Sequence, residues 1–304
     1  MAGLNTISLV VHILACSIVT LIVALRFGIK LSLRMPWVGE DVLCIVALIL
    51  YNAHGACAIV YTYIKGPTKN HMTSDQVAAK SKVFYISSLL FAPMVLSIKL
   101  TILYVLTRLF HRFRRVYMVY IFEVILVLYY TAILFAKIFI CNPVSAYWLV
   151  TPTRKSDQCR DRRGVIIADS SVSVATDLAI LGFSVAMAWP LRVKRTRKLS
   201  VMAILGAGGA AVGFTLYRLV AVSNFNSGEQ MRLILRLLML DAAEGGIGLI
   251  CACLPVVKKL VESVMGKYHT ERQGDAPSDQ GPIITSENAP PELNSVPSSV
   301  SAVP

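Results

Sequence analysis

Charged and polar side chains interrupt the apolar runs of this sequence, and their types could support chemistry. Asp241 and Glu244 are three residues apart, so a helix would carry both carboxyl groups on one face. Gly245 and Gly246 follow them and would leave space beside that face. A carboxylic acid in apolar surroundings keeps its proton more readily, so either residue could act as a proton donor. Comparable groups in the other apolar runs are Tyr51, His54, Lys99, Asp177 and Arg218.

The composition indicates a protein that dissolves in a lipid bilayer. Of the 304 residues, 56% are apolar and only 15% are charged, whereas about 25% are charged in an average soluble domain. The net charge of +13 does not indicate nucleic acid, because Lys and Arg form short clusters between long apolar runs. Such clusters are typical of loops at a lipid headgroup surface. Membrane lipid is therefore an expected partner, and nucleic acid is not.

Seven segments are long enough to cross the hydrocarbon core of a membrane, which takes about 20 helical residues. They predict an all-α fold, a seven-transmembrane helix bundle over residues 1–267. Residues 268–304 are rich in Pro, Ser, Asp and Glu and are expected to form a disordered cytosolic tail. The predicted spans are residues 5–27, 41–64, 83–107, 116–140, 165–190, 200–222 and 231–256.

The loops between these spans indicate an orientation. Fifteen Lys and Arg residues fall on one side of the predicted bundle and ten on the other. Because basic loops favour the cytosol, this bias predicts an N-terminus outside and a C-terminus in the cytosol. Cys141 and Cys159 then share the loop 141–164 on the oxidising side, where a disulfide could join them. Two free thiols are the alternative.

Ionisable groups inside a membrane usually face the interior of a bundle or a water-filled cavity. We therefore expect the polar residues to gather around one cavity that opens away from the cytosol. Arg218 and Lys99 are the candidate counter-ions, and at least one should pair with an acid of span 165–190 or span 231–256. A different interpretation is that each polar residue only fastens helices together. The sequence does not decide whether Lys137 faces lipid or packs inside.

No cofactor or metal is expected. A retinal protein of the microbial type needs a lysine in its last helix to form the Schiff base, and span 231–256 contains none; Lys258 and Lys259 lie beyond its end. Nucleotide-binding, zinc-binding and diphosphate-binding motifs are also missing from the sequence. The acidic pair Glu40-Asp41 stands at the start of span 41–64, where it could cap the helix.

Several short patterns occur in an order that resembles the fungal rhodopsin-like integral membrane family, which includes the satratoxin-cluster membrane proteins. They extend from residue 26 to about residue 260, and it is the ordered set that carries the resemblance. The absence of a Cys-rich module before the first span makes the chain similar to the short, receptor-like members. The patterns are Trp37-Val-Gly-Glu-Asp41, Lys99-Leu-Thr-Ile-Leu-Tyr104, Arg108-Leu-Phe110, Cys141-x-Pro143-x4-Trp148 with Cys159, Thr176-Asp177-Leu, Tyr217-Arg218-Leu, and Glu244 followed by Cys251-Ala-Cys-Leu-Pro255.

Two functions are compatible with this resemblance, which implies a multi-pass protein of the plasma membrane or an endomembrane. In the first, a receptor-like or accessory protein binds a small lipophilic ligand, and its basic inner loops face a cytosolic partner. In the second, a membrane-embedded cyclase or isomerase acts on a terpenoid or polyketide intermediate. Asp241 or Glu244 would then protonate the substrate, with Asp177 or His54 as the base. The family's association with secondary-metabolite genes suits both. The ligand-binding residues would be Tyr51, His54, Lys99, Asp177, Arg218, Asp241 and Glu244.

Overall fold

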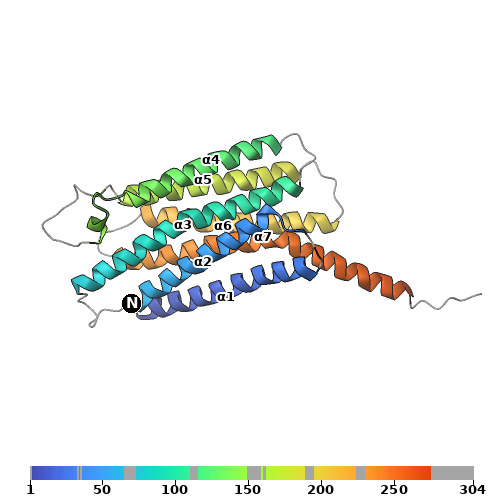
Figure 1. The fold of residues 1–304 in the computed structure, drawn as a ribbon, viewed down its shortest axis with the longest axis horizontal. Coiled ribbons are helices and arrows are strands. Elements are labelled where there is room, and N and C mark those ends of the chain that lie inside the picture. The colour runs from blue at the N-terminus through green and yellow to red at the C-terminus, as the bar shows by residue number, and fades with distance from the viewer. Residues whose placement is uncertain are drawn as a thin grey trace, which may run out of the picture. The chain divides into compact units, whose positions relative to one another are not determined.

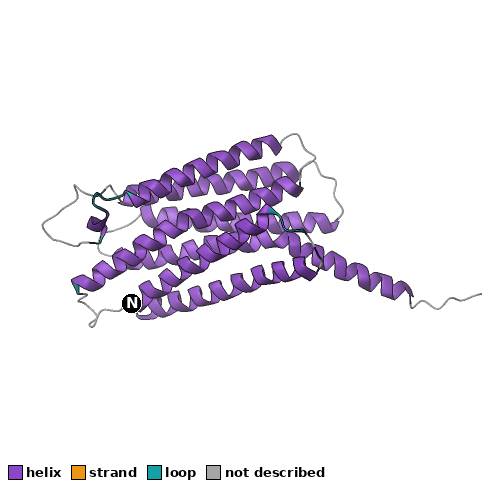
Figure 2. Ribbon diagram, viewed as in Figure 1, coloured by secondary structure: helices purple, strands orange, loops and turns teal. Residues whose placement is uncertain are grey.

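The structure, a computed structural model, consists of helices in the residues that it describes. These are residues 2–32, 34, 36–64, 73–109, 116–148, 159, 162–188, 195–223 and 230–274. The chain divides into two compact units, Met1–Glu262 and Ser263–Pro304. Within the described ranges there are seven α-helices, one short 3-10 helix and no β-strand (Figure 2). The predicted all-α fold is confirmed.

Each predicted span corresponds to one helix, although several helices extend beyond the predicted limits. The third begins at Ser74 rather than at residue 83, and the first ends at Ser32 rather than at residue 27. The helices are α1 (Ala2–Ser32), α2 (Gly39–Tyr63), α3 (Ser74–Leu109), α4 (Val116–Ile138), α5 (Arg162–Ala188), α6 (Arg195–Ser223) and α7 (Gln230–Gly274), with η1 (Val144–Tyr147) between α4 and α5.

The helices have the length and apolar character that a membrane requires. Six of them contain a stretch that is long and apolar enough to cross a bilayer. In α6 the apolar stretch identified is shorter, Gly208–Ser223, but the helix has 29 residues, and its length of about 43 Å exceeds the hydrocarbon thickness. Large apolar side chains also point away from the bundle: Leu21 is 70% exposed and Leu128 is 66% exposed. Such surfaces suit contact with lipid.

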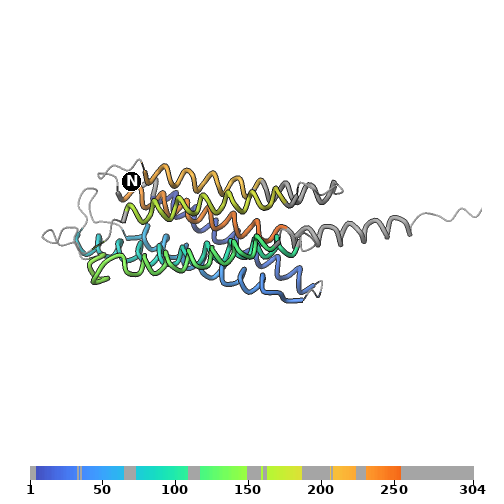
Figure 3. The backbone as a smooth tube through the Cα atoms, turned by 90° about the horizontal axis from the view of Figure 1, so that it is seen from above, coloured from blue at the N-terminus to red at the C-terminus, as the bar shows by residue number. Residues whose placement is uncertain are grey.

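Within Met1–Glu262 the helices run alongside one another (Figures 1 and 3). Helix α2 packs against α1 and α3, α3 also packs against α4, and α5 packs against α6. Polar contacts tie α7 to α1 and α2. The Nε2 atom of His12 lies 3.3 Å from the carbonyl oxygen of Leu238, and the Tyr51 hydroxyl donates to the carbonyl oxygen of Ala242 at 3.1 Å.

Glycines allow α7 to approach α2 and α3 closely. A methyl group on Gly245 would lie 2.9 Å from Met94 Cε, and one on Gly246 would lie 2.9 Å from the Tyr51 hydroxyl. The expectation that Gly245 and Gly246 leave open space beside the acidic face was therefore wrong. Met94 and Tyr51 occupy that space, and the two glycines serve helix packing instead.

The segment after α4 contains the predicted disulfide. Cys141 and Cys159 are bonded to each other, and their backbones form an isolated antiparallel bridge. Tyr147 of η1 packs beside Cys141 in an apolar cluster that also contains Tyr85. The disulfide therefore fastens the segment that carries η1 to the start of α5.

Helix α7 continues to Gly274 and so includes residues 268–274, which were expected to begin the disordered tail. Residues 275–304 lie outside the described residues.

Candidate functional site

Basic and acidic side chains from α3 to α7 meet inside the bundle, and Arg218 of α6 lies at the centre. Its Nη1 atom is 3.1 Å from Asp241 Oδ1 and 3.5 Å from Glu244 Oε2, both on α7. Its Nη2 atom is 3.5 Å from Asp169 Oδ2 on α5. The predicted pairing of Arg218 with an acid of the fifth or seventh span is confirmed.

Lys99 of α3 forms the second ion pair of this network. Its Nζ atom lies 2.8 Å from Asp177 Oδ1 and donates to Thr176 Oγ1 at 2.6 Å. It also donates to Ser173 Oγ at 3.2 Å, and the Ser173 hydroxyl donates to Glu244 Oε1 at 2.8 Å. Glu244 therefore connects the Lys99 group with the Arg218 group.

Lys137 of α4 completes the network, and the sequence did not decide its place. The Lys137 Nζ atom donates to Asp169 Oδ2 at 2.8 Å, and its side chain is 8% exposed. Lys137 therefore faces the interior rather than lipid. Asp169 accepts from both Lys137 and Arg218, so it links α4, α5 and α6.

Membrane burial explains why these groups are paired. An isolated charge at the centre of a bilayer costs about 2.5–3.5 kcal/mol on insertion scales, so each buried ion needs partners. The network, named here the Arg218 network, unites three basic side chains with four acidic ones. Its members are Lys99, Lys137, Asp169, Asp177, Arg218, Asp241 and Glu244.

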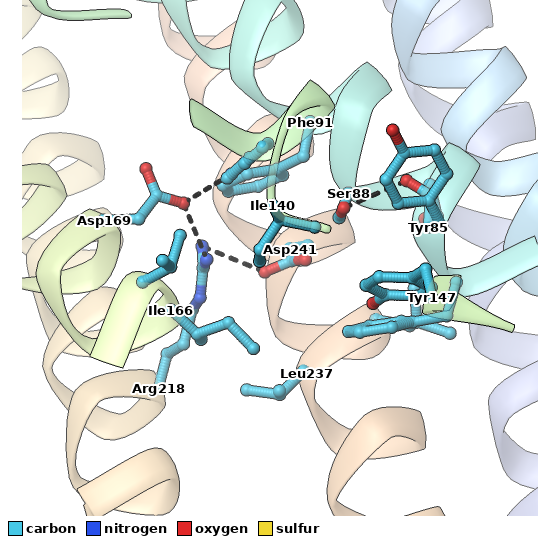
Figure 4. A pocket seen from close by; sticks show the side chains of 15 residues that line it. Tyr85, Ser88, Phe91, Ile140, Tyr147, Ile166, Asp169, Arg218, Leu237 and Asp241 are labelled. Atoms are coloured by element: carbon cyan, nitrogen blue, oxygen red, sulfur yellow. Dashed lines mark hydrogen bonds and ion pairs between the residues drawn. The ribbon is translucent and has the colours of Figure 1, made fainter. Parts of the chain in front are cut away.

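A pocket, named here the deep pocket, adjoins one face of this network (Figure 4). Arg218, Asp169 and Asp241 form its polar wall, with dashed contacts that join them in the figure. The Phe91 ring lies 4.4 Å from the Arg218 guanidinium carbon, in a cation–π arrangement. The lining residues are Phe84, Tyr85, Ser87, Ser88, Phe91, Lys137, Ile140, Tyr147, Val165, Ile166, Asp169, Arg218, Leu237, Leu238 and Asp241.

Part of the polar wall has unused hydrogen-bonding capacity. Within the described residues, the Nε and Nη1 atoms of Arg218 and the Oδ1 atom of Asp241 are buried and form no hydrogen bond. Arg218 Nη1 and Asp241 Oδ1 are close enough to attract each other, but their geometry does not satisfy a hydrogen bond. Buried polar atoms of this kind cost free energy until a partner is found.

A second, larger pocket adjoins the first at one end of the bundle. This end pocket shares Phe84, Tyr147, Ile166 and Leu237 with the deep pocket. Its other lining residues come from the end of α2, the start of α3, α5 and α7, and the end of α6. They are Tyr61, Val77, Lys80, Ser81, Arg163, Val222, Met231, Leu233 and Ile234.

The structure divides the residues that the sequence singled out. Arg218 and Asp241 line the deep pocket, whereas Lys99 and Glu244 lie behind its wall within the network. Asp177 lines a separate, smaller pocket between α5 and α6. Tyr51 and His54 line none of the three pockets.

His54 does not line the deep pocket, but it contacts two residues that do. Its Nδ1 atom lies 2.9 Å from the hydroxyl oxygen of Ser87, which is a lining residue, and its ring packs near Phe91. Tyr51 instead fills the space beside the glycines of α7. These two predicted ligand-binding residues therefore hold helices in place around the pocket.

Two residues of the pocket wall, Asp169 and Lys137, were absent from the predicted ligand-binding set. Asp169, Ser173 and Asp177 follow one another at intervals of four residues on α5, so they share one helix face. That spacing is a sequence signal that could have placed Asp169 beside Asp177. For Lys137 no comparable spacing exists.

The N-terminal end of α2 carries a second ion cluster. The sequence did not predict that its members lie together. Asp41 Oδ2 accepts from Lys30 Nζ at 2.6 Å and from the Val38 backbone N–H at 3.0 Å. Glu40 Oε1 lies 3.1 Å from Arg26 Nη2 and 3.2 Å from Arg108 Nη1. Asp41 therefore caps α2, as expected, and the pair also ties α2 to α1 and α3.

The described residues contain no group of three or more His, Cys, Asp and Glu side chains arranged to hold a metal ion.

Comparison with known proteins places the chain in a family. Residues 25–263 match the fungal rhodopsin domain. The chain is also similar to a SAT4 family membrane protein of Emericella nidulans, with 28% identity over 196 residues. That match covers 62% of this chain and 48% of the relative, so the chain spans about half the length of the relative that it matches. No solved structure matches. The match over 25–263 and the apolar helices show that the chain belongs to the fungal rhodopsin domain family and is a multi-pass integral membrane protein.

Proposed function

We propose that this protein is a receptor-like or accessory membrane protein that binds a small lipophilic ligand in the deep pocket. The observation that carries the proposal is the composition of the pocket wall. Aromatic and aliphatic side chains make up most of the described lining, and its charged residues are Lys137, Asp169, Arg218 and Asp241. Pockets that bind small molecules combine mostly apolar walls with a few polar groups that fix orientation.

The unused hydrogen-bonding capacity of the wall supports the same proposal. Arg218 Nη1 and Nε are donors and Asp241 Oδ1 is an acceptor, so a hydroxyl or carbonyl group on the ligand would find a partner. The association with secondary-metabolite biosynthesis that the family resemblance implies remains part of the proposal. So does an orientation in which both pockets open on the non-cytosolic side.

A cyclase or isomerase is the second candidate, and one observation favours a specific form of it. Asp241 is the only one of the three predicted catalytic acids, among the described residues, that lines the deep pocket. Glu244 accepts from Ser173, and Asp177 pairs with Lys99. An enzyme of this fold would therefore depend on Asp241.

Blocking the pocket tests the proposed binding. Purified protein in phosphatidylcholine nanodiscs is incubated with a panel of sesquiterpene alcohols and polyketide lactones, and bound ligand is measured by native mass spectrometry. We expect at least one compound to bind saturably, and Ile166→Trp, which fills both pockets, to abolish its binding. The matched control is Leu178→Trp, on an exposed position of the same helix, which should bind normally.

The same incubation separates the two candidate functions. Because cyclisation and isomerisation leave the mass unchanged, the recovered compound is analysed by chromatographic retention and fragmentation. An unchanged compound supports reception, whereas an isomeric product that disappears in Asp241→Asn would support catalysis. If Ile166→Trp binds every compound as well as the unaltered protein does, the deep pocket is not the binding site.

A further inference from the structure

Lys80 is a buried ammonium group that has no acidic partner among the described residues. Its side chain lines the end pocket, and the residue is only 7% exposed. Its Nζ atom lies 3.9 Å from the sulfur of Met231 and 4.9 Å from the centre of the Tyr61 ring. No carboxylate of the described residues lies within ion-pair distance of Lys80, in contrast to the buried lysines of the Arg218 network.

This arrangement is unusual because a buried charge is normally paired with an opposite charge. A thioether sulfur is a weak acceptor, and an aromatic face attracts a cation without neutralising it. The end pocket is also lined by Arg163, which donates to the carbonyl oxygen of Ser223, and the described lining residues include no Asp or Glu. Among the described lining residues, Lys80 is thus a positive charge with no acid beside it.

We propose that the end pocket binds the anionic group of an amphipathic ligand, with Lys80 as the principal contact. The inference rests on the proposed function, since it names the chemical class of the ligand: a hydrocarbon body with one carboxylate, phosphate or sulfate end. Lys80 holds the anion. The apolar residues shared by the two pockets, Phe84, Ile166 and Leu237, hold the adjoining part of the body.

The charge of the deep pocket supports this orientation of the ligand. The described lining of the deep pocket carries two basic side chains, Lys137 and Arg218, and two acidic ones, Asp169 and Asp241, so its charges balance, whereas Lys80 has no acid beside it in the described lining of the end pocket. The anionic end is therefore expected in the end pocket, and the rest of the ligand in the deep pocket.

The spacing of lining residues on α3 indicates how long the ligand can be. Lys80, Phe84, Ser88 and Phe91 lie on one face of the helix and pass from the end pocket into the deep pocket. At 1.5 Å per residue, Lys80 and Phe91 are about 16 Å apart along the axis, which suits an extended chain of about a dozen carbon atoms.

Binding of two matched probes tests the inference. Dodecanoate and dodecanol have the same hydrocarbon length, and their affinities are measured with purified protein in phosphatidylcholine nanodiscs. We expect dodecanoate to bind about tenfold or more tightly than dodecanol, because only the carboxylate can pair with Lys80. Lys80→Gln should remove this difference, whereas Lys80→Arg should retain most of it.

Lys82 provides the control. It carries the same charge two residues away, but it is exposed, and its Nζ atom lies over the Trp148 ring rather than in the pocket. Lys82→Gln should therefore keep the preference for dodecanoate. The melting temperature of Lys80→Gln should equal or exceed that of the unaltered protein, because the substitution removes a buried charge that has no acidic partner.

The outcomes separate the two proposals. Equal affinities of the unaltered protein for dodecanoate and dodecanol, or an unchanged preference in Lys80→Gln, would overturn the anion site alone. If neither probe nor any compound of the wider panel binds, the proposed function itself fails. A last measurement identifies the source of the anion by repeating the dodecanoate titration in nanodiscs that contain phosphatidylglycerol. Loss of dodecanoate binding assigns the pocket to a lipid headgroup. Unchanged dodecanoate binding assigns it to a free amphiphile.

Discussion

Arg218 is the residue on which the polar interior depends most. It reaches acids on two other helices, Asp169 on α5 and both Asp241 and Glu244 on α7. It also packs against Phe91, so a cation–π contact with an aromatic face stabilises its charge on that side. A cation with three acidic neighbours cannot be removed without leaving buried carboxylates uncompensated.

Replacing Arg218 by Gln should therefore destabilise the protein strongly. The loss of one partner from a buried ion network costs about 3–5 kcal/mol, because the remaining charges stay desolvated. We expect the midpoint of unfolding in a dodecyl sulfate titration to fall by a corresponding amount.

The double variant Arg218→Gln with Asp241→Asn should recover part of this loss, since it removes one of the stranded carboxylates. The control is Arg236→Gln on the exposed side of α7, which should change the unfolding free energy by less than about 0.5 kcal/mol. Equal effects of Arg218→Gln and Arg236→Gln would show that the network contributes no net stability.

At this scale the sequence predicted residue types better than residue contacts. Membrane burial made Arg218, Lys99 and the acids of α5 and α7 conspicuous, because charges are rare at that depth. It did not reveal that Tyr51 fills the space beside two glycines of α7, since that depends on the rotation of α2. The sequence predicts that a helix exists, but it does not predict how that helix is rotated about its axis in the bundle.

At the scale of elements, glycines set the distance between α7 and its neighbours. A methyl group added to Gly248 would lie 2.5 Å from Ile98 Cγ2 on α3. This neighbour cannot move aside easily, because a β-branched side chain has one strongly preferred rotamer in a helix. The close approach of α3 and α7 therefore depends on the absence of a side chain at Gly248.

The substitution Gly248→Ala should separate α3 from α7 and cost about 1–3 kcal/mol of unfolding free energy. Gly182→Ala on α5 is the matched control, because no heavy atom lies within 4 Å of the added methyl group. That control should be neutral or stabilising by up to about 1 kcal/mol, since alanine favours helices. Dodecyl sulfate titration of both variants measures the difference, and a stable Gly248→Ala protein would contradict the close packing.

The ion cluster at the N-terminal end of α2 joins α1, α2 and α3 through the acidic pair Glu40-Asp41. Asp41 binds Lys30 of α1 and caps α2, while Glu40 reaches Arg108 of α3. The sequence suggested the cap alone, because a cap is local, whereas its partners lie on other helices.

The substitution Asp41→Ala should lower the free energy of unfolding by more than the loss of a helix cap would. Removal of a cap costs about 1 kcal/mol, whereas removal of a fully buried partner of Lys30 and Arg26 should raise the cost to about 3–5 kcal/mol. Asp75→Ala, in the exposed first turn of α3, is the control. A loss of only about 1 kcal/mol for Asp41→Ala would mean that the ion pairs add nothing beyond the cap.

At the scale of the whole molecule, composition alone was sufficient to predict the class of fold. Helices of about 20 apolar residues are the structures that satisfy every backbone group in lipid, so seven apolar runs required seven helices. Composition could not predict the two adjoining pockets, because these depend on which side chains meet between α3, α5, α6 and α7. The sequence suggested a small lipophilic ligand, whereas the proposed anionic end of that ligand follows from the structure.

The orientation of the molecule determines from which compartment a ligand would arrive. The excess of Lys and Arg in one set of loops predicts an N-terminus outside. The bonded pair Cys141–Cys159 lies at the end of the bundle that also carries the end pocket, and disulfides persist in oxidising compartments. Both features favour pockets that open away from the cytosol.

An acceptor site for N-glycosylation tests this orientation directly. When it is joined to the N-terminus through a flexible linker, the site should be glycosylated, and the protein should shift in mass until it is treated with a glycosidase. The same site joined to the C-terminus should remain unmodified, because the C-terminus is expected in the cytosol. The opposite pattern would place the end pocket on the cytosolic side. A lipophilic anion would then have to reach Lys80 from inside the cell, and the Cys141–Cys159 bond would have to survive in a reducing compartment.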